Sequence, residues 1–159
     1  NLLNIVDHII IGGGMAYTFS VAKGGSIGDS LFEADRVDKC AEILAKAAEK
    51  GVQIHLPTDN VIADAFSNEA SQKLCDSSAI PNGWMGLDIG DDSSKAFAEV
   101  LHNSKTILWN GPMGVFEMTS YEAGTRAVAE AVATATRSGA FSLIGGGDSS
   151  AAVKKIWVH

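Results

Sequence analysis

Three glycine-bearing stretches stand where apolar runs of the sequence end, and their residue types and spacing could do chemistry. These stretches are Gly12–Gly14, Gly111–Gly114 and Gly145–Gly147. Glycine lets backbone N–H groups approach a ligand without a Cβ in the way. A helix that begins directly afterwards adds unpaired N–H groups and the positive end of its dipole. Turns of this composition therefore suit an anionic ligand such as a phosphate group.

The stretch "GGGDSS", residues 145–150, carries the most chemistry of the three. Asp148 or Ser149 can cap the helix predicted to follow, and the Asp148 carboxylate could hold a magnesium ion that bridges phosphates. Alternatively, the glycines make only a tight strand-to-helix turn, and Asp148 is only an N-cap. The second triple glycine, together with Trp-Asn-Gly-Pro at a third strand end, favours a nucleotide site. The glycines match neither the P-loop pattern nor the dinucleotide fingerprint.

Two further segments carry groups that a nucleotide would need. Glu117 could accept hydrogen bonds from ribose hydroxyls, although a solvated loop glutamate is the alternative. Gly86 and Leu87 could offer an apolar face to a base. A loop cluster of Trp84, Met85 and Leu87, packed on the core, would explain the same residues without a ligand.

The sequence offers no identifiable nucleophile for covalent catalysis. A Gly-x-Ser-x-Gly elbow does not occur, and neither Cys40 nor Cys75 has a helper group that spacing reveals. This pattern fits phosphoryl transfer, in which positioning and charge stabilisation dominate. The two cysteines are 35 residues apart, so free thiols in a reducing compartment are predicted, with the cytoplasm as the default.

The elements that must position these glycines are short apolar runs alternating with longer periodic segments. Most of the runs lack polar alternation, as parallel strands covered on both faces do. The alternation of strands with helices predicts right-handed βαβ units, hence an α/β fold with a parallel sheet. The predicted strands are His8–Ile11, Val52–Leu56, Thr106–Trp109 and Phe141–Ile144, with a weaker one at Val61–Ala63.

Capping residues predict where the helices begin and end. Gly51 closes a helix whose apolar positions start at Val37, and Gly139 closes a later one. Ser93 or Ser94 can cap a helix carrying Phe97, Val100 and Leu101, and Thr119 with Glu122 forms a capping box. The stretch 66–92 is the least regular part of the chain, and no second domain boundary is evident.

Composition bounds the class of protein. The chain has 159 residues, of which 46% are hydrophobic and 19% charged, so one folded domain is expected. A formal charge of −7 disfavours binding to nucleic acid or to acidic membranes. The apolar runs are shorter than the roughly 20 residues that span a bilayer, and the four histidines have no ligand spacing.

Four segments together resemble the signature segments of phosphoglycerate kinase, in that family's order. They are "IIIGGGMAYTF", "IPNGWMGLDIG", "ILWNGPMGVFE" and "LIGGGDSSAAV". The resemblance implies a kinase that moves a phosphoryl group between 1,3-bisphosphoglycerate and Mg-ADP, giving 3-phosphoglycerate and ATP. It further implies that residues 1–159 are part of the C-terminal, nucleotide-binding domain of a two-domain glycolytic enzyme, typically monomeric. The implied fold is a Rossmann-like doubly wound parallel sheet with helices on both faces.

The resemblance also implies a role for individual residues. The adenine slot would be lined by Gly12, Gly13, Leu31, Gly86 and Leu87. Pro112 and Glu117 would meet the ribose, and Asn110 would contact the phosphate chain. Gly146 and Gly147 would present N–H groups to the transferring phosphoryl. Asp148 would hold Mg²⁺, and Ser149 would cap the helix beside the phosphates.

The chain departs from the family pattern in ways that bear on activity. Ser149 stands where the family usually has threonine, and Ala65 stands where it often has lysine. A central strand with its lysines, an edge strand and the N-terminal domain that binds 3-phosphoglycerate have no counterpart in the sequence. We therefore expect either an excerpt of a longer protein or a chain whose gap another polypeptide fills, and we expect it to be unstable and inactive alone. A non-catalytic adenine-nucleotide-binding module and a purely structural α/β domain are the alternatives.

Overall fold

The computed structural model describes residues 6–145 and shows a mixed α/β fold. Its helices are α1 (Gly14–Ala22), α2 (Val37–Lys50), α3 (Asp91–His102) and α4 (Ala123–Arg137), with two 3-10 turns, Ala34–Arg36 and Thr119–Tyr121. Its strands are β1 (His8–Ile10), β2 (Ser26–Ile27), β3 (Gln53–His55), β4 (Asp59–Ala63), β5 (Gln72–Asp76), β6 (Ala79–Ile80), β7 (Met85–Ile89), β8 (Thr106–Asn110) and β9 (Phe141–Gly145).

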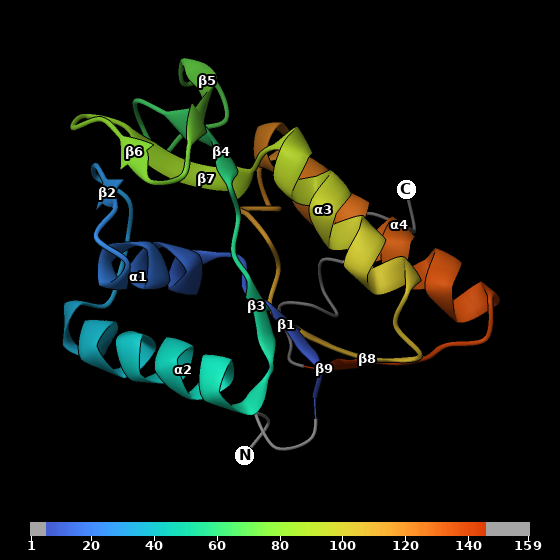
Figure 1. Ribbon diagram of the computed structural model, residues 1–159. Coiled ribbons are helices and arrows are strands. Elements are labelled where there is room, and N and C mark those ends of the chain that lie inside the picture. The colour runs from blue at the N-terminus through green and yellow to red at the C-terminus, as the bar shows by residue number, and fades with distance from the viewer. Residues whose placement is uncertain (1–5, 146–159) are drawn as a thin grey trace.

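The parallel pairing predicted from the apolar runs is confirmed. Strand β1 pairs with β3, with Ile9 opposite Ile54, and β8 pairs with β9, with Leu108 opposite Leu143. Helices α1 and α2 connect the first pair and lie on one side of it, while α3 and α4 pack together on the other side (Figure 1). The carboxyl ends of β1 and β8 run into the glycine stretches at residues 12–14 and 111–114.

The region 66–92, predicted to be irregular, instead contains three strands. Strands β5 and β7 flank β4 in an antiparallel sheet of order β5-β4-β7, and β6 pairs with β2. A bulge between Val61 and Ile62 shifts the register against β7. Within the described residues the strands form four separate small sheets, so the single doubly wound sheet implied by the resemblance is not seen there. Strand β5 is mostly exposed, and β7 holds Gly86 and Asp88 among its apolar residues, so neither shows the apolar pattern that marks a strand.

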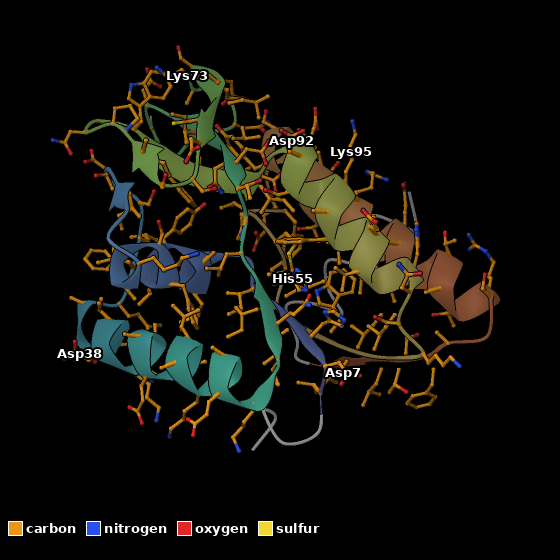
Figure 2. All side chains as sticks on the ribbon, in the orientation of Figure 1. Asp7, Asp38, His55, Lys73, Asp92 and Lys95 are labelled. Atoms are coloured by element: carbon orange, nitrogen blue, oxygen red, sulfur yellow. The ribbon has the colours of Figure 1, made fainter. Side chains whose placement is uncertain are left out.

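Two of the predicted helix caps are wrong for one shared reason. Helix α3 begins at Asp91, before Ser93 (Figure 2 marks the first turn at Asp92), because the Asp59 carboxylate of β4 accepts hydrogen bonds from the N–H groups of Asp92 and Ser93. Likewise the capping box at Thr119 does not form, since those residues make a 3-10 turn. Both starts are capped by carboxylates from distant strands, which sequence spacing cannot show.

The predicted helix ends are confirmed. Helix α2 stops at Lys50, and Gly51 follows in the left-handed region with a φ of 73°. Helix α4 stops at Arg137, two residues before Gly139. A glycine adopts these left-handed angles without a steric penalty from Cβ.

The largest core cluster lies between α3, α4 and β8. Phe97 and Leu101 of α3 pack with Trp109 of β8 and Val132 of α4. A second cluster, around Tyr17 and Ile62, joins α1 to the antiparallel sheet. None of the helices in the described part of the chain is long and apolar enough to cross a membrane.

Candidate nucleotide-binding site

A cavity of about 360 Å³ lies where the two glycine stretches meet strand β7. Its walls come from segments that are far apart in the sequence, and they include six residues predicted for a nucleotide site: Gly12, Gly13, Leu31, Gly86, Leu87 and Pro112. Helix α1 begins in this wall and runs between α2 and the antiparallel sheet (Figure 1). Tertiary structure thus brings the predicted adenine-lining residues to one place.

The glycines here are required by contact as well as by conformation. Gly13 has a φ of 67°, and its N–H donates to the Met113 carbonyl at 3.2 Å. A Cβ added at Gly12 would overlap the Met113 side chain, and one added at Gly86 would overlap the Tyr17 ring. Glycine at residues 12 and 86 therefore lets three chain segments approach closely enough to form one cavity.

The opposite wall is apolar and partly open. Leu31 is 79% exposed and Phe66 is 56% exposed, although both line the cavity. Exposed apolar side chains at a cavity rim are typical of a site that covers a flat apolar ligand. Leu31 is placed by its neighbour Ser30, whose buried hydroxyl accepts a hydrogen bond from the Gly86 N–H at 2.8 Å.

Phe66 is a lining residue that sequence reasoning missed. It stands in a stretch rich in Ser, Asn and Asp, where a lone phenylalanine was the available signal. Met113 and Val115 were missed as well, and both belong to the loop between β8 and the 3-10 turn at Thr119. Trp84 instead packs against the second core cluster beneath the Lys73 ammonium, 4.3 Å from its ring, so for this residue the loop-cluster interpretation is confirmed (Lys73 is labelled in Figure 2).

The remaining predicted residues fall at or beyond the edge of the cavity. Asn110 ends β8, and Glu117 is exposed two residues beyond the lining residue Val115. The end of β8 is held by Trp109, whose buried indole N–H donates to the Gly111 carbonyl at 2.7 Å. Gly146, Gly147, Asp148 and Ser149 lie outside the described residues.

A buried carboxylate lies directly behind the cavity wall. Asp88 follows Leu87 and is fully buried, and burial raises its pKa to about 7 although N–H bonds from Gly124 and Ile89 oppose the shift. The Asn60 amide donates to the Asp88 carbonyl at 2.9 Å and to the Tyr17 hydroxyl at 3.3 Å. Burial, and secondarily the charge of Asp88, raises the pKa of Tyr17.

The described residues do not form a metal centre of three or more His, Cys, Asp or Glu side chains. His8 and His55 form a pair, with Nδ1 and Nε2 3.0 Å apart across β1 and β3 (Figure 2 labels His55). The predicted ligand of magnesium, Asp148, lies beyond the described part. Mg²⁺ takes few protein ligands together with phosphate oxygens, so one carboxylate would be enough to hold it beside a bound nucleotide.

The molecule is an α/β protein with a cavity near the carboxyl ends of parallel strands, walled by glycine turns and apolar side chains, which is where α/β proteins commonly hold small ligands. The family model described as phosphoglycerate kinase matches residues 1–159. The chain belongs to the phosphoglycerate kinase family.

Relatives and solved structures agree with this assignment. The chain is 53% identical to phosphoglycerate kinase 3, cytosolic, of Arabidopsis thaliana, a match that covers 98% of this chain and 39% of that protein. It is also 53% identical to phosphoglycerate kinase of Porphyromonas gingivalis, over 98% of this chain and 37% of the relative. The structure of phosphoglycerate kinase from Coxiella burnetii superposes with a TM-score of 0.93 at 42% identity, covering 98% of this chain and 39% of that one. The chain thus spans less than two fifths of the length of these relatives.

Proposed function

We propose that this chain is the adenine-nucleotide-binding part of a phosphoglycerate kinase, which transfers a phosphoryl group between 1,3-bisphosphoglycerate and Mg-ADP. The observation that carries the proposal is the single cavity that joins Gly12, Gly86 and Pro112 beside the apolar rim of Leu31 and Phe66. Its apolar, glycine-walled shape suits a purine ring. Relatives that carry the name phosphoglycerate kinase support the reaction class.

Within this proposal the base lies between the Gly12–Gly13 turn and the Gly86–Leu87 wall, under Leu31. Pro112 and the exposed Glu117 face the ribose, and Asn110 at the end of β8 faces the phosphates. The phosphate chain then extends towards the residues that follow β9. There, Gly146 and Gly147 donate N–H groups to the transferring phosphoryl, Asp148 holds Mg²⁺ and Ser149 caps the next helix. Bound Mg²⁺ would neutralise the charge of the phosphate oxygens.

We also propose that residues 1–159 are one part of a larger doubly wound domain. The parallel pairs β1–β3 and β8–β9 are separate, and parallel strands are ordinarily covered on both faces. Leu108, Phe141 and Leu143 of the β8–β9 pair are each more than half exposed. An additional central strand and edge strand, and a second domain that binds 3-phosphoglycerate, would complete the enzyme. Without them we expect residues 1–159 to be inactive, since the resemblance assigns the lysines that stabilise the transferring phosphoryl to the central strand.

The location and assembly of the protein stay predictions. A cytoplasmic protein that binds neither nucleic acid nor membranes is the expectation from charge and cysteine usage, and the family resemblance implies a monomer. Similarity to relatives does not distinguish a cytosolic from a chloroplast location. The chain is 53% identical to the Arabidopsis protein named cytosolic and 51% identical to one named chloroplastic.

A second candidate function is nucleotide binding without turnover. It is favoured by the cavity itself, because the residues proposed to contact the base already lie together within the described part of the chain. Calorimetry with Mg-ADP on this chain, and on the chain extended through the missing strands, tests both. If only the extended chain binds, the site belongs to the intact kinase domain. Equal binding by both would favour the module and would contradict our emphasis on the central strand. Binding by neither would overturn the nucleotide proposal.

A further inference from the structure

The loop 111–115, which forms one wall of the cavity, is held from behind by the first turn of helix α4. The Thr125 hydroxyl oxygen accepts hydrogen bonds from the N–H groups of Met113, at 3.1 Å, and Gly114, at 3.3 Å. Thr125 is fully buried and does not line the cavity. A hydroxyl oxygen has two lone pairs, so its whole acceptor capacity is used by this one loop.

The first turn of α4 is in turn tied to the strand that forms the opposite wall. Asp88 of β7 accepts a hydrogen bond from the Gly124 N–H at 2.9 Å through Oδ2, and from the Ile89 N–H at 2.9 Å through Oδ1. A Cβ added at either Gly114 or Gly124 would overlap Asp88 Oδ1, so the loop, the helix and the carboxylate are in direct contact.

The hydrogen bonds close into a ring. From Asp88 the path runs through Gly124 and Thr125 to Gly114, and the Val115 N–H returns to β7 by donating to the Leu87 carbonyl at 2.9 Å. The same loop reaches the other glycine turn, because the Met113 carbonyl accepts from the Gly13 N–H. Loop position thus sets the separation of the Gly12–Gly13 and Gly86–Leu87 walls.

We propose that Thr125 and Asp88 are positioning residues for the nucleotide site, which hold loop 111–115 at the distance from β7 that a base requires. This inference rests on the proposed function. Loss of the Thr125 hydroxyl would leave two buried N–H groups without an acceptor, and the loop would move to find water or another partner. The nucleotide would then bind to a cavity that must first be reassembled, which lowers affinity.

The test compares threonine variants on one helix, in whichever form of the chain binds Mg-ADP. Thr125→Val keeps the shape and removes the acceptor, Thr125→Ser keeps the hydroxyl, and Thr136→Val removes a hydroxyl that donates to the Val132 carbonyl near the other end of α4. We expect Thr125→Val to raise the Kd for Mg-ADP about tenfold, and Thr125→Ser and Thr136→Val to leave it within about twofold. An unchanged Kd in Thr125→Val, or an equal rise in Thr136→Val, would overturn the proposal.

Amide hydrogen exchange provides a second test, which requires no nucleotide and no substituted protein. In the unaltered protein the amide hydrogens of Met113 and Gly114 should exchange with solvent as slowly as those in the middle of α4, because both are bonded to a buried acceptor. Rapid exchange at these two amides would refute the ring. Slow exchange together with no nucleotide binding would leave the ring intact and refute only the proposed function.

Asp88 is tested against a matched carboxylate. Asp59 caps α3 as Asp88 caps α4, accepting from the Ser93 N–H at 2.9 Å, and it does not line the first cavity. Asp88→Asn places an amide N–H₂ group against one of two backbone donors, so Mg-ADP affinity should fall about tenfold. Asp59→Asn should lower the thermal midpoint but keep the affinity. If both substitutions changed the Mg-ADP affinity equally, Asp88 would have no role in the site beyond that of an ordinary helix cap.

Discussion

Two cavities of similar size lie on either side of Tyr17, and their linings differ. The first, about 360 Å³, is walled by glycines and apolar side chains. The second, about 290 Å³, has more polar residues in its lining, among them Ser20, Lys23, Asn60 and Ser77. Ser77 donates to the Asn60 amide oxygen, and Ser20 donates to the Ser77 carbonyl. Within the described residues, no buried side-chain polar atom is left without a partner.

The difference shows that volume by itself does not identify a ligand site. In the second cavity Ser20, Ser77 and Asn60 already bond one another, so a ligand that contacts them would have to replace existing hydrogen bonds at little net gain. In the first, exposed Leu31 and Phe66 would lose water contact when a flat ligand enters, which is favourable. Substitutions in each of the two cavities can test this difference.

The largest effect is expected from Gly86→Ala, which puts a methyl group into the Tyr17 ring. Mg-ADP binding should fall at least tenfold, and overpacking should cost about 1–3 kcal/mol of stability. Calorimetry and thermal unfolding measure the two. Gly14→Ala is the control for stability alone, because Gly14 also lines the cavity; its Cβ would meet no protein atom within 4 Å and the residue is helical, so stability should be kept or improved. Full Mg-ADP affinity in Gly86→Ala would show that the base does not lie against β7.

The buried Asp88 behind the wall of the first cavity should make the stability of the protein depend on pH. The Asp88 carboxyl has a folded-state pKa of about 7, above its ordinary value of 3.8, so its contribution to stability is present below pH 4 and is lost as the pH rises to 7. Asp88→Asn removes this dependence. Urea unfolding should therefore show a larger destabilisation by the substitution at pH 5 than at pH 8. A larger destabilisation at pH 8 would mean that the folded protein prefers the ionised carboxylate.

The next largest loss of Mg-ADP affinity is expected from truncating the exposed apolar side chains at the rim of the first cavity. Phe66→Ala and Leu31→Ala should each weaken Mg-ADP binding about five- to tenfold, while the free energy of unfolding stays within about 0.5 kcal/mol because both side chains are mostly exposed. Leu74→Ala is the matched control, since Leu74 is 58% exposed on β5 and lines neither cavity. If Leu74→Ala weakens binding as much, the rim has no special role.

The smallest effect on binding is expected from the second cavity. Ser77→Ala removes the hydroxyl that donates to Asn60, so it should cost about 1 kcal/mol of stability. The Mg-ADP affinity should remain within about twofold by calorimetry. A large loss of affinity would mean that the two cavities act as one site through Tyr17, and the contrast between them would fail.

Local patterns in the sequence were enough for the parallel strands and for the glycine turns. The runs at residues 9–11 and 107–109 are apolar without interruption, as the strands of parallel sheets are, and each forms most of a strand in a parallel pair. The expected burial on both faces is not seen in the described residues, since Leu108 is 58% exposed. The antiparallel strands β5 and β7 escaped prediction because the mostly exposed β5 and the β7 run with its Gly86 and Asp88 lack the apolar pattern of a strand. The bulge between Val61 and Ile62 also shifts the register of β4 against β7, and the spacing of apolar residues does not predict such a shift.

The residues of the candidate site also fall into two groups, those that the sequence predicted and those that it did not. Gly12, Gly13 and Gly86 were predictable because conformational freedom and small size belong to the residue itself. Phe66 was not, because its place at the rim depends on how the loop after β4 folds over the cavity. Thr125 was not predictable either, since its hydroxyl meets Met113 and Gly114 only after α4 packs behind the loop.

The sequence alone therefore determined where the chain can turn tightly and which runs can be buried strands, since both are properties of neighbouring residues. Only the tertiary structure decided which carboxylates cap α3 and α4, because Asp59 and Asp88 reach those helices from strands distant in sequence. It also decided the cavity itself, which exists because packing brings the glycine turns against β7. A hydrogen bond between remote segments depends on how the whole chain folds, and no local spacing records it.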